Sequence, residues 1–171
     1  MDRGQIHVYT GNGKGKTTAA LGLSVRAVLA GKRVFFGQFV KGMDYSELKI
    51  SEYLPNLEIK QFGRDCFIYN EPDEEDILAA QEGLRECSEV LKSGDYDLVV
   101  LDELSIALYY KLFSLEKAIY ALNGRNPETE VVITGRYAPQ ELIDLADLVT
   151  EMKEIKHYYT SGLEARKGIE F

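Results

Sequence analysis

Three glycines and two lysines near the N-terminus have the types and the spacing that bind phosphate. They lie in the stretch Thr10-Gly11-Asn12-Gly13-Lys14-Gly15-Lys16-Thr17-Thr18. Glycines at alternate positions allow successive backbone N–H groups to turn toward one centre, where they bind an anion. The stretch matches the phosphate-loop pattern G-x-x-x-x-G-K-[ST], except that Thr10 stands in the first glycine position. We therefore predict nucleotide-phosphate contacts from every residue of the range 11–18.

Individual side chains in this loop have separate predicted roles. Lys16 can reach phosphate oxygens as a point charge, and the Thr17 hydroxyl can bind Mg²⁺. Lys14 either contacts phosphate or is a solvated loop lysine. A helix that begins near Lys16 would add its unpaired N–H groups and the positive end of its dipole.

Two carboxylates, Asp102 and Glu103, directly follow the apolar run Leu98-Val99-Val100-Leu101. Ligands of open parallel sheets bind at the carboxyl ends of the strands. Asp102 is therefore predicted to hold Mg²⁺ together with Thr17. Glu103 would orient water in a hydrolase, or contact the ribose or the metal. Lys16, Asp102 and Glu103 are the candidate catalytic residues.

Strand and helix patterns alternate along the chain. Apolar or alternating runs predict strands over 5–9, 33–40, 57–62, 98–101, 130–134 and 148–152. Helical periodicity and stop residues predict helices over 16–30, 45–54, 72–93, 105–112, 114–123 and 139–146. This order predicts an α/β fold with right-handed crossovers and a mostly parallel sheet of about six strands. No linker composition divides the chain, so residues 1–171 are expected to form one domain.

Composition and charge exclude several classes of protein. The 171 residues carry 20 basic and 28 acidic side chains, a net charge of −8. This charge disfavours a protein that binds along nucleic acid or on an anionic membrane surface. Residues 1–42 are nonetheless basic, with seven basic residues against one acidic residue, while residues 71–103 hold twelve acids. No apolar run reaches the ~20 residues of a membrane span, and no secretory leader is evident. We expect a cytoplasmic protein with reduced thiols at Cys66 and Cys87 and no zinc site.

Five motifs together resemble one family over essentially the whole chain. They are the loop 9–18, Gln38-Phe39-Val40-Lys41-Gly42, Val100-Leu101-Asp102-Glu103-Leu104, Ile133-Thr134-Gly135-Arg136, and a tail with Lys156-His157 and Gly168-Ile169. The chain is similar to the P-loop class of cob(I)alamin adenosyltransferases. The resemblance implies a three-layer, RecA-like P-loop NTPase fold.

The resemblance also implies a reaction and its participants. The 5′-deoxyadenosyl group of ATP would pass to the cobalt(I) of a corrinoid such as cobalamin or a precursor, with Mg²⁺ bound and triphosphate released. Arg136 would contact the nucleotide, and Phe67 and Tyr69 would pack on the lower face of the corrin. The expected partners are a second copy of the chain and a reduced, flavodoxin-type flavoprotein. Some relatives in that family carry an N-terminal extension that forms a helical lid over the site, whereas only residues 1–4 precede the first predicted strand here. Either the lid is missing or something else, such as the tail 156–171, shields the site from water.

Two other functions remain open at the level of the sequence. A hydrolytic, RecA-like P-loop ATPase would use Glu103 to polarise water. A nucleotide-gated binding protein would deliver a corrinoid without catalysis.

Overall fold

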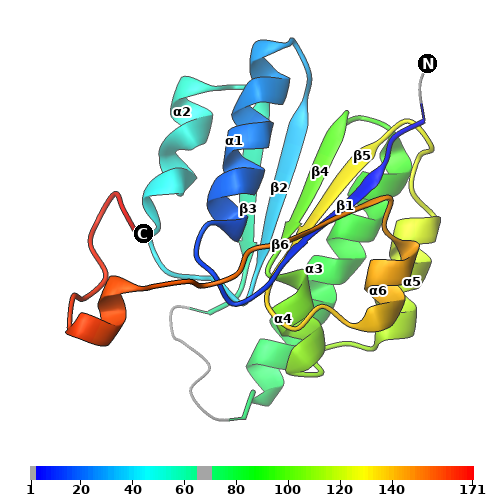
Figure 1. The fold of residues 1–171 in the computed structure, drawn as a ribbon. Helices are drawn as coiled ribbons and strands as arrows, with labels where there is room; N and C mark the ends of the chain where they lie inside the picture. Colours follow the sequence, from blue (N-terminus) through cyan, green and yellow to red (C-terminus); the bar gives the residue numbers. More distant parts are fainter. Residues whose placement is uncertain (1–2, 65–70) are drawn as a thin grey trace.

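The computed structural model describes residues 3–64 and 71–171. In this part of the chain the strands form one sheet of six, and every pairing is parallel. The order across the sheet is β3-β2-β4-β5-β1-β6 (Figure 1). The strands are β1 (Ile6–Thr10), β2 (Val34–Phe39), β3 (Leu57–Phe62), β4 (Leu98–Asp102), β5 (Glu130–Thr134) and β6 (Leu148–Glu151). The predicted α/β class and parallel sheet are confirmed.

Helices cover both faces of the sheet, which gives the predicted three layers (Figure 1). One face carries α1 and α2, and the other carries α3, α4, α5 and α6. The adjacent residues Phe35 and Phe36 of β2 illustrate the arrangement, because their side chains belong to the cores on opposite faces. The helices are α1 (Lys16–Leu29), α2 (Ile50–Tyr53), α3 (Glu74–Ser93), α4 (Leu104–Tyr109), α5 (Leu115–Asn123) and α6 (Gln140–Leu145), with 3₁₀ turns η1 (Ser46–Lys49) and η2 (Tyr158–Ser161).

Burial of the strands follows their place in the sheet. Every residue of β2 and β4 is buried, as expected of strands covered on both faces. The edge strand β6 has all four of its residues exposed. The carboxyl ends of β1, β2, β4 and β5 lie on one edge of the sheet because the strands are parallel.

Three predicted helices differ from the structure by two or more residues at one end or both, and the other three by no more than one residue at either end. The segment predicted as one helix over 45–54 forms the short η1 and α2 instead. The helix predicted to reach Leu112 ends at Tyr109, because Lys111 has a φ of +56°, which an α-helix cannot contain. The acidic helix α3 begins at Glu74 and not at Pro72, because Asp73 caps it.

The cap of α3 is a reciprocal pair of hydrogen bonds. The Asp76 backbone N–H donates to Asp73 Oδ1 at 3.0 Å, and the Asp73 N–H donates to Asp76 Oδ2 at 3.1 Å. This capping box satisfies two backbone donors that have no partner within the helix. The Asp73 carboxylate also pairs with Arg64.

Replacing Asp73 by alanine is expected to lower the free energy of unfolding by about 1 kcal/mol, since that is the usual cost of losing a side-chain cap. Urea denaturation followed by circular dichroism measures the change. Asp95→Ala, at an exposed position beyond the other end of α3, is the matched control and should leave stability unchanged. Equal stability of the Asp73→Ala variant and the wild type would contradict the role of the cap.

Candidate functional site

The phosphate loop joins β1 to α1 at the carboxyl edge of the sheet. Gly11 and Gly15 have φ values of +99° and +117°, in the region that favours glycine. The loop is also pressed against the segment after β6, where the Gly13 N–H donates to the Met152 carbonyl at 2.7 Å. A Cβ on Gly11 would lie 2.4 Å from the same carbonyl oxygen. Side chains at these positions would therefore distort the loop.

Lys16 begins α1 and is buried. Its Nζ donates to the Gly13 carbonyl at 2.6 Å, so the amine folds back over the loop. Burial lowers the pKa of Lys16, while the nearby carboxylates of Glu103 and Asp102 act in the opposite direction. The amine thus lies among the loop's backbone groups, close to where an anion would bind.

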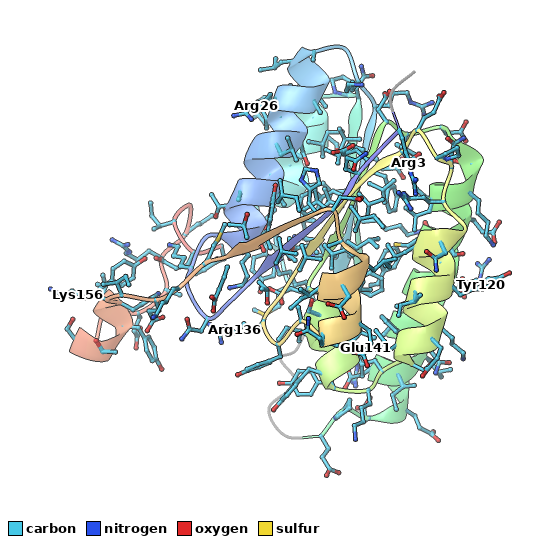
Figure 2. All side chains as sticks on the ribbon, turned by 45° about the vertical axis from the view of Figure 1, so that its right-hand side comes forward. Arg3, Arg26, Tyr120, Arg136, Glu141 and Lys156 are labelled. Carbon is cyan, nitrogen blue, oxygen red and sulfur yellow. The ribbon has the colours of Figure 1, made fainter. Side chains whose placement is uncertain are left out.

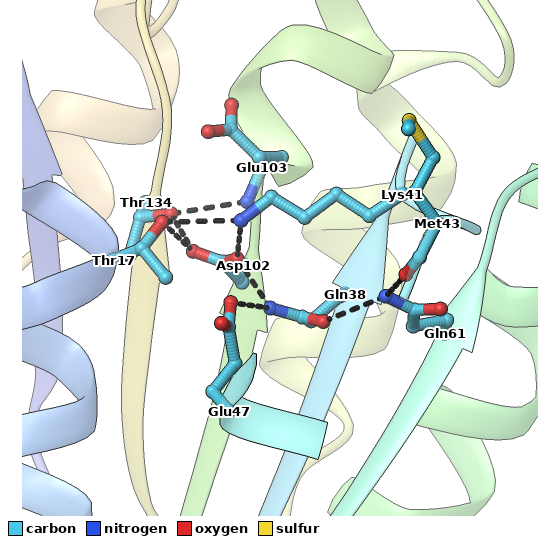
Figure 3. A network of polar contacts seen from close by, with 9 residues as sticks. All are labelled: Thr17, Gln38, Lys41, Met43, Glu47, Gln61, Asp102, Glu103 and Thr134. Carbon is cyan, nitrogen blue, oxygen red and sulfur yellow. Dashed lines mark hydrogen bonds and ion pairs between the residues drawn. The ribbon is translucent and has the colours of Figure 1, made fainter. Parts of the chain in front are cut away.

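Asp102 ends β4 and is the centre of a buried polar network (Figure 3). Its Oδ1 accepts from Thr17 Oγ1 at 2.8 Å and from Thr134 Oγ1 at 2.6 Å. Its Oδ2 accepts from Lys41 Nζ at 2.8 Å and from Gln38 Nε2 at 3.2 Å. The predicted metal-binding pair, Thr17 and Asp102, is therefore brought into direct contact.

Three members of this network were not predicted as site residues. Gln38 belongs to β2, Lys41 follows it, and Thr134 ends β5. Each lies in a motif that carries the family resemblance, and each comes at the carboxyl end of a strand. That position was the available signal, because the carboxyl ends of neighbouring parallel strands meet at one edge.

Glu103 directly follows Asp102 and turns the chain into α4. It has a φ of +59°, in the left-handed region, and its backbone N–H donates to Thr134 Oγ1 at 3.0 Å. Burial, together with the negative charge of Asp102, raises the pKa of the Glu103 carboxyl. Glu103 faces the same cavity as Lys16.

The C-terminal segment closes one side of the phosphate loop. Lys14 Nζ donates to Tyr158 Oη at 3.0 Å, to the Ile169 carbonyl at 3.0 Å and to Glu170 Oε1 at 2.9 Å. The Lys14 amine is thus bound to the tail, and Lys14 also lines the cavity beside the loop, so its contact with phosphate stays a prediction. Asn12 is engaged in the same way, since its Oδ1 accepts from the Glu154 N–H at 3.1 Å.

The attachment of this tail is expected to depend on pH. Hydrogen bonds from Tyr158 and Lys14 hold the pKa of the Glu170 carboxyl well below its usual range. A lowered carboxyl pKa stabilises the attached state above the ordinary value of about 4.3, and this stabilisation is lost as the pH falls through the lower pKa. Hydrogen exchange of residues 158–171, expressed relative to the intrinsic rate that acid itself slows, should therefore become faster at acidic pH. Glu170→Gln should quicken it at pH 7, whereas Glu164→Gln, an exposed control in the same segment, should not.

A cavity of about 570 Å³ lies between the phosphate loop and the C-terminal segment. Its lining includes residues of the phosphate loop, the site cations and the C-terminal segment, among them Asn12, Gly13, Lys14, Gly15, Lys16, Thr17, Thr18, Lys41, Glu103, Arg136 and Glu170. Arg136, predicted to contact the nucleotide, thus lies at this cavity (Figure 2). A larger cavity of about 850 Å³ lies between α3 and α5 and contains none of the predicted site residues. The smaller cavity is therefore the candidate site.

The predicted Mg²⁺ ligands have suitable chemistry. Thr17 and Asp102 supply a hydroxyl and a carboxylate, both hard oxygen donors of the kind that Mg²⁺ binds. Among the described residues, no cluster of three or more histidine, cysteine or acidic side chains could hold a metal ion alone. A magnesium ion bound by one or two protein oxygens and by substrate phosphates needs no such cluster. The donor set fits Mg²⁺ that arrives with a nucleotide.

The predicted corrin contacts Phe67 and Tyr69 lie outside the described residues, as does Cys66. Cys87 is buried, as the inert thiol of a core residue would be. Among the helices described, none is long and apolar enough to cross a membrane.

The parallel sheet, the glycine-rich loop after β1 and the Asp102 carboxylate at the end of β4 define a protein with a P-loop NTPase-like fold. Comparison with known families gives a more specific result. Residues 2–171 match the family described as ATP:corrinoid adenosyltransferase BtuR/CobO/CobP, and the chain belongs to this family of transferases. The resemblance seen in the sequence motifs is confirmed.

Curated relatives agree with this assignment over nearly the whole chain. A corrinoid adenosyltransferase of Salmonella typhimurium is 40% identical over 172 residues, which span 99% of this chain and 87% of the relative. The corrinoid adenosyltransferase of Escherichia coli K12 is 38% identical with the same two coverages. The Pseudomonas aeruginosa protein of the same name is 34% identical, over 99% of this chain and 85% of its own.

Proposed function

We propose that this chain transfers the 5′-deoxyadenosyl group of ATP to the cobalt(I) centre of a corrinoid and releases triphosphate. The observation that carries the proposal is the full-length family match of a chain whose Lys16 and Thr17 line one cavity, with Asp102 bonded to Thr17 beneath it. Cobalt(I) supplies the electron pair for the new cobalt–carbon bond and becomes formally cobalt(III). The carbon–oxygen bond at the ribose 5′ position breaks, and triphosphate leaves with its electron pair.

The residues of the phosphate loop would stabilise this leaving group. Negative charge accumulates on the triphosphate as the carbon–oxygen bond breaks. The loop N–H groups and the Lys16 ammonium are fixed beside the cavity before the reaction, so they need little reorganisation to stabilise that charge. Mg²⁺ held by Thr17 and Asp102 would add Lewis-acid stabilisation of the phosphate oxygens.

The remaining site residues would orient the substrates. The nucleophile belongs to the corrinoid, so the reaction needs no protein nucleophile or general base. Glu103 and Arg136 line the cavity with opposite charges, and we assign them to the ribose or metal and to the nucleotide, respectively. Phe67 and Tyr69 are proposed to pack on the lower face of the corrin.

The proposal extends to the state of the protein. Residues 1–171 would act as one nucleotide-binding domain, in a homodimer located in the cytoplasm. A reduced flavoprotein of the flavodoxin type would supply the electron that produces cobalt(I).

Anaerobic incubation with MgATP and chemically reduced cobalamin tests the activity. The expected products are a light-sensitive alkylcobalamin and inorganic triphosphate in equal amounts. Release of orthophosphate without an alkylcobalamin would favour the hydrolytic ATPase. Corrinoid binding without any turnover would favour the nucleotide-gated binding protein.

A further inference from the structure

A strained backbone directs Lys41 into the site. Val40, directly after β2, has a φ of +60°, which is unusual for a β-branched residue and is found where the surrounding structure enforces it. The next residues pack closely against the end of β3. A Cβ on Gly63 would lie 2.5 Å from the Lys41 backbone nitrogen, and one on Gly42 would lie 2.3 Å from the Arg64 carbonyl carbon. This close backbone contact fixes the position from which the Lys41 side chain extends.

The ammonium of Lys41 contacts both proposed metal ligands. Its Nζ lies 2.8 Å from Asp102 Oδ2 and 3.4 Å from Thr17 Oγ1 (Figure 3). The Lys41 side chain is 14% exposed and the Asp102 side chain is fully buried. The ring of Tyr45 lies on the cation as well, with its centroid 5.2 Å from Nζ. Burial works against the charge on Lys41, but Asp102 outweighs it and raises the pKa of this amine.

No other cation within bonding distance neutralises Asp102 in the part of the chain that the structure describes. The loop lysine, Lys16, is bonded to the Gly13 carbonyl, and Asp102 forms its one ion pair with Lys41. A divalent cation bound to Asp102 and Thr17 would contact the oxygens that the Lys41 ammonium now contacts. It would also supply the positive charge that Lys41 now supplies to Asp102. Lys41 and the metal ion therefore compete for this place.

We propose that Lys41 is a counter-ion that occupies the cation site of the nucleotide-free protein and yields it to the metal ion of the incoming metal–nucleotide complex. Lys41 also lines the cavity, so its ammonium can turn from Asp102 toward the phosphates bound there. The exchange keeps Asp102 neutralised at every stage. It also prevents free divalent cations from binding before the nucleotide. This inference rests on the proposed nucleotide site but not on transfer to a corrinoid.

Manganese binding to the nucleotide-free protein tests the exchange, with the free Mn²⁺ signal followed by electron paramagnetic resonance. Lys41→Met removes the charge and keeps the length of the side chain. We expect it to bind Mn²⁺ at least about tenfold more tightly than the wild type, because a charge next to the site has been removed. Lys41→Arg, which keeps the charge, should stay close to the wild type. Lys49→Met, at an exposed lysine nearby, is the matched control.

Two further measurements locate the effect. Adding Asp102→Asn to Lys41→Met should abolish the gained Mn²⁺ binding, because the carboxylate is lost. In metal-free buffer with EDTA, Lys41→Met should bind ATP about tenfold more weakly, as expected for a lost charged hydrogen bond to phosphate.

The proposal is overturned if Lys41→Met binds Mn²⁺ no more tightly than the wild type. It is also overturned, without any variant, if the nucleotide-free wild type binds Mn²⁺ as tightly as it does with ATP. Neither readout uses a corrinoid, so failure here is distinct from failure of the transferase assay. A chain that passes this test but forms no alkylcobalamin would keep Lys41 as the counter-ion and lose the proposed reaction.

Discussion

Lys16→Ala is expected to reduce turnover by about 100-fold to 1000-fold, the usual loss when a fixed group that stabilises transition-state charge is removed. The Lys16 amine lies over the phosphate loop and faces the cavity. Its contribution should grow as negative charge gathers on the leaving triphosphate, so the larger effect is expected on kcat. Steady-state kinetics with MgATP and reduced cobalamin measure kcat and KM separately.

The same substitution should change stability little. Lys16 is buried and its pKa is lowered, so its removal also relieves the cost of burying a charge. Lys49→Ala, at an exposed lysine that does not line the cavity, is the control for a simple loss of charge. Turnover of the Lys16→Ala variant within a few-fold of the wild type would show that the loop binds phosphate without this amine.

Asp102→Ala is expected to abolish turnover and also to lower the free energy of unfolding by about 3 kcal/mol. Removing one partner of a buried ion pair leaves the other charge uncompensated, which typically costs 3–5 kcal/mol. We place the effect at the low end because Lys41 lines the cavity and can turn toward water there. Chemical denaturation measures the stability, and the alkylcobalamin assay measures the activity.

A second variant separates the two effects of Asp102. Lys41→Met combined with Asp102→Ala removes both charges, so most of the lost stability should return while activity stays absent. A double variant as unstable as Asp102→Ala alone would mean that the lost bonds from Thr17 and Thr134, rather than the charge, account for the destabilisation.

The secondary structure and the phosphate loop could be predicted from the sequence because they depend on local patterns. The buried run 98–101 and the glycine spacing of 11–15 are both short-range signals. Helix ends were less accurate. The helix α4 ends at Tyr109 because Lys111 has a left-handed backbone conformation. The helix α3 begins after Asp73 because the Asp73 side chain caps it.

The network around Asp102 depends on the order of strands, which local patterns do not contain. Lys41 meets Asp102 because β2 pairs with β4, and Thr134 meets it because β5 lies on the other side. The tail is attached to Lys14 partly through Glu170, which lies 156 positions further along the chain. Hydropathy and spacing therefore predicted the edge of the sheet at which these side chains meet, but not which side chains complete the network around Asp102.

The strand β5, which separates β1 from β4, has a consequence for the electric field of the site. Thr134, at the end of β5, has a short, buried side chain whose hydroxyl donates to the Asp102 carboxylate. A buried threonine side chain polarises less than water, so it screens the negative charge of the Asp102 carboxylate only weakly. The negative charge of Asp102 therefore acts strongly on a cation at the position that the Lys41 ammonium occupies. Through Thr134, β5 thus strengthens the attraction of the site for positive charge.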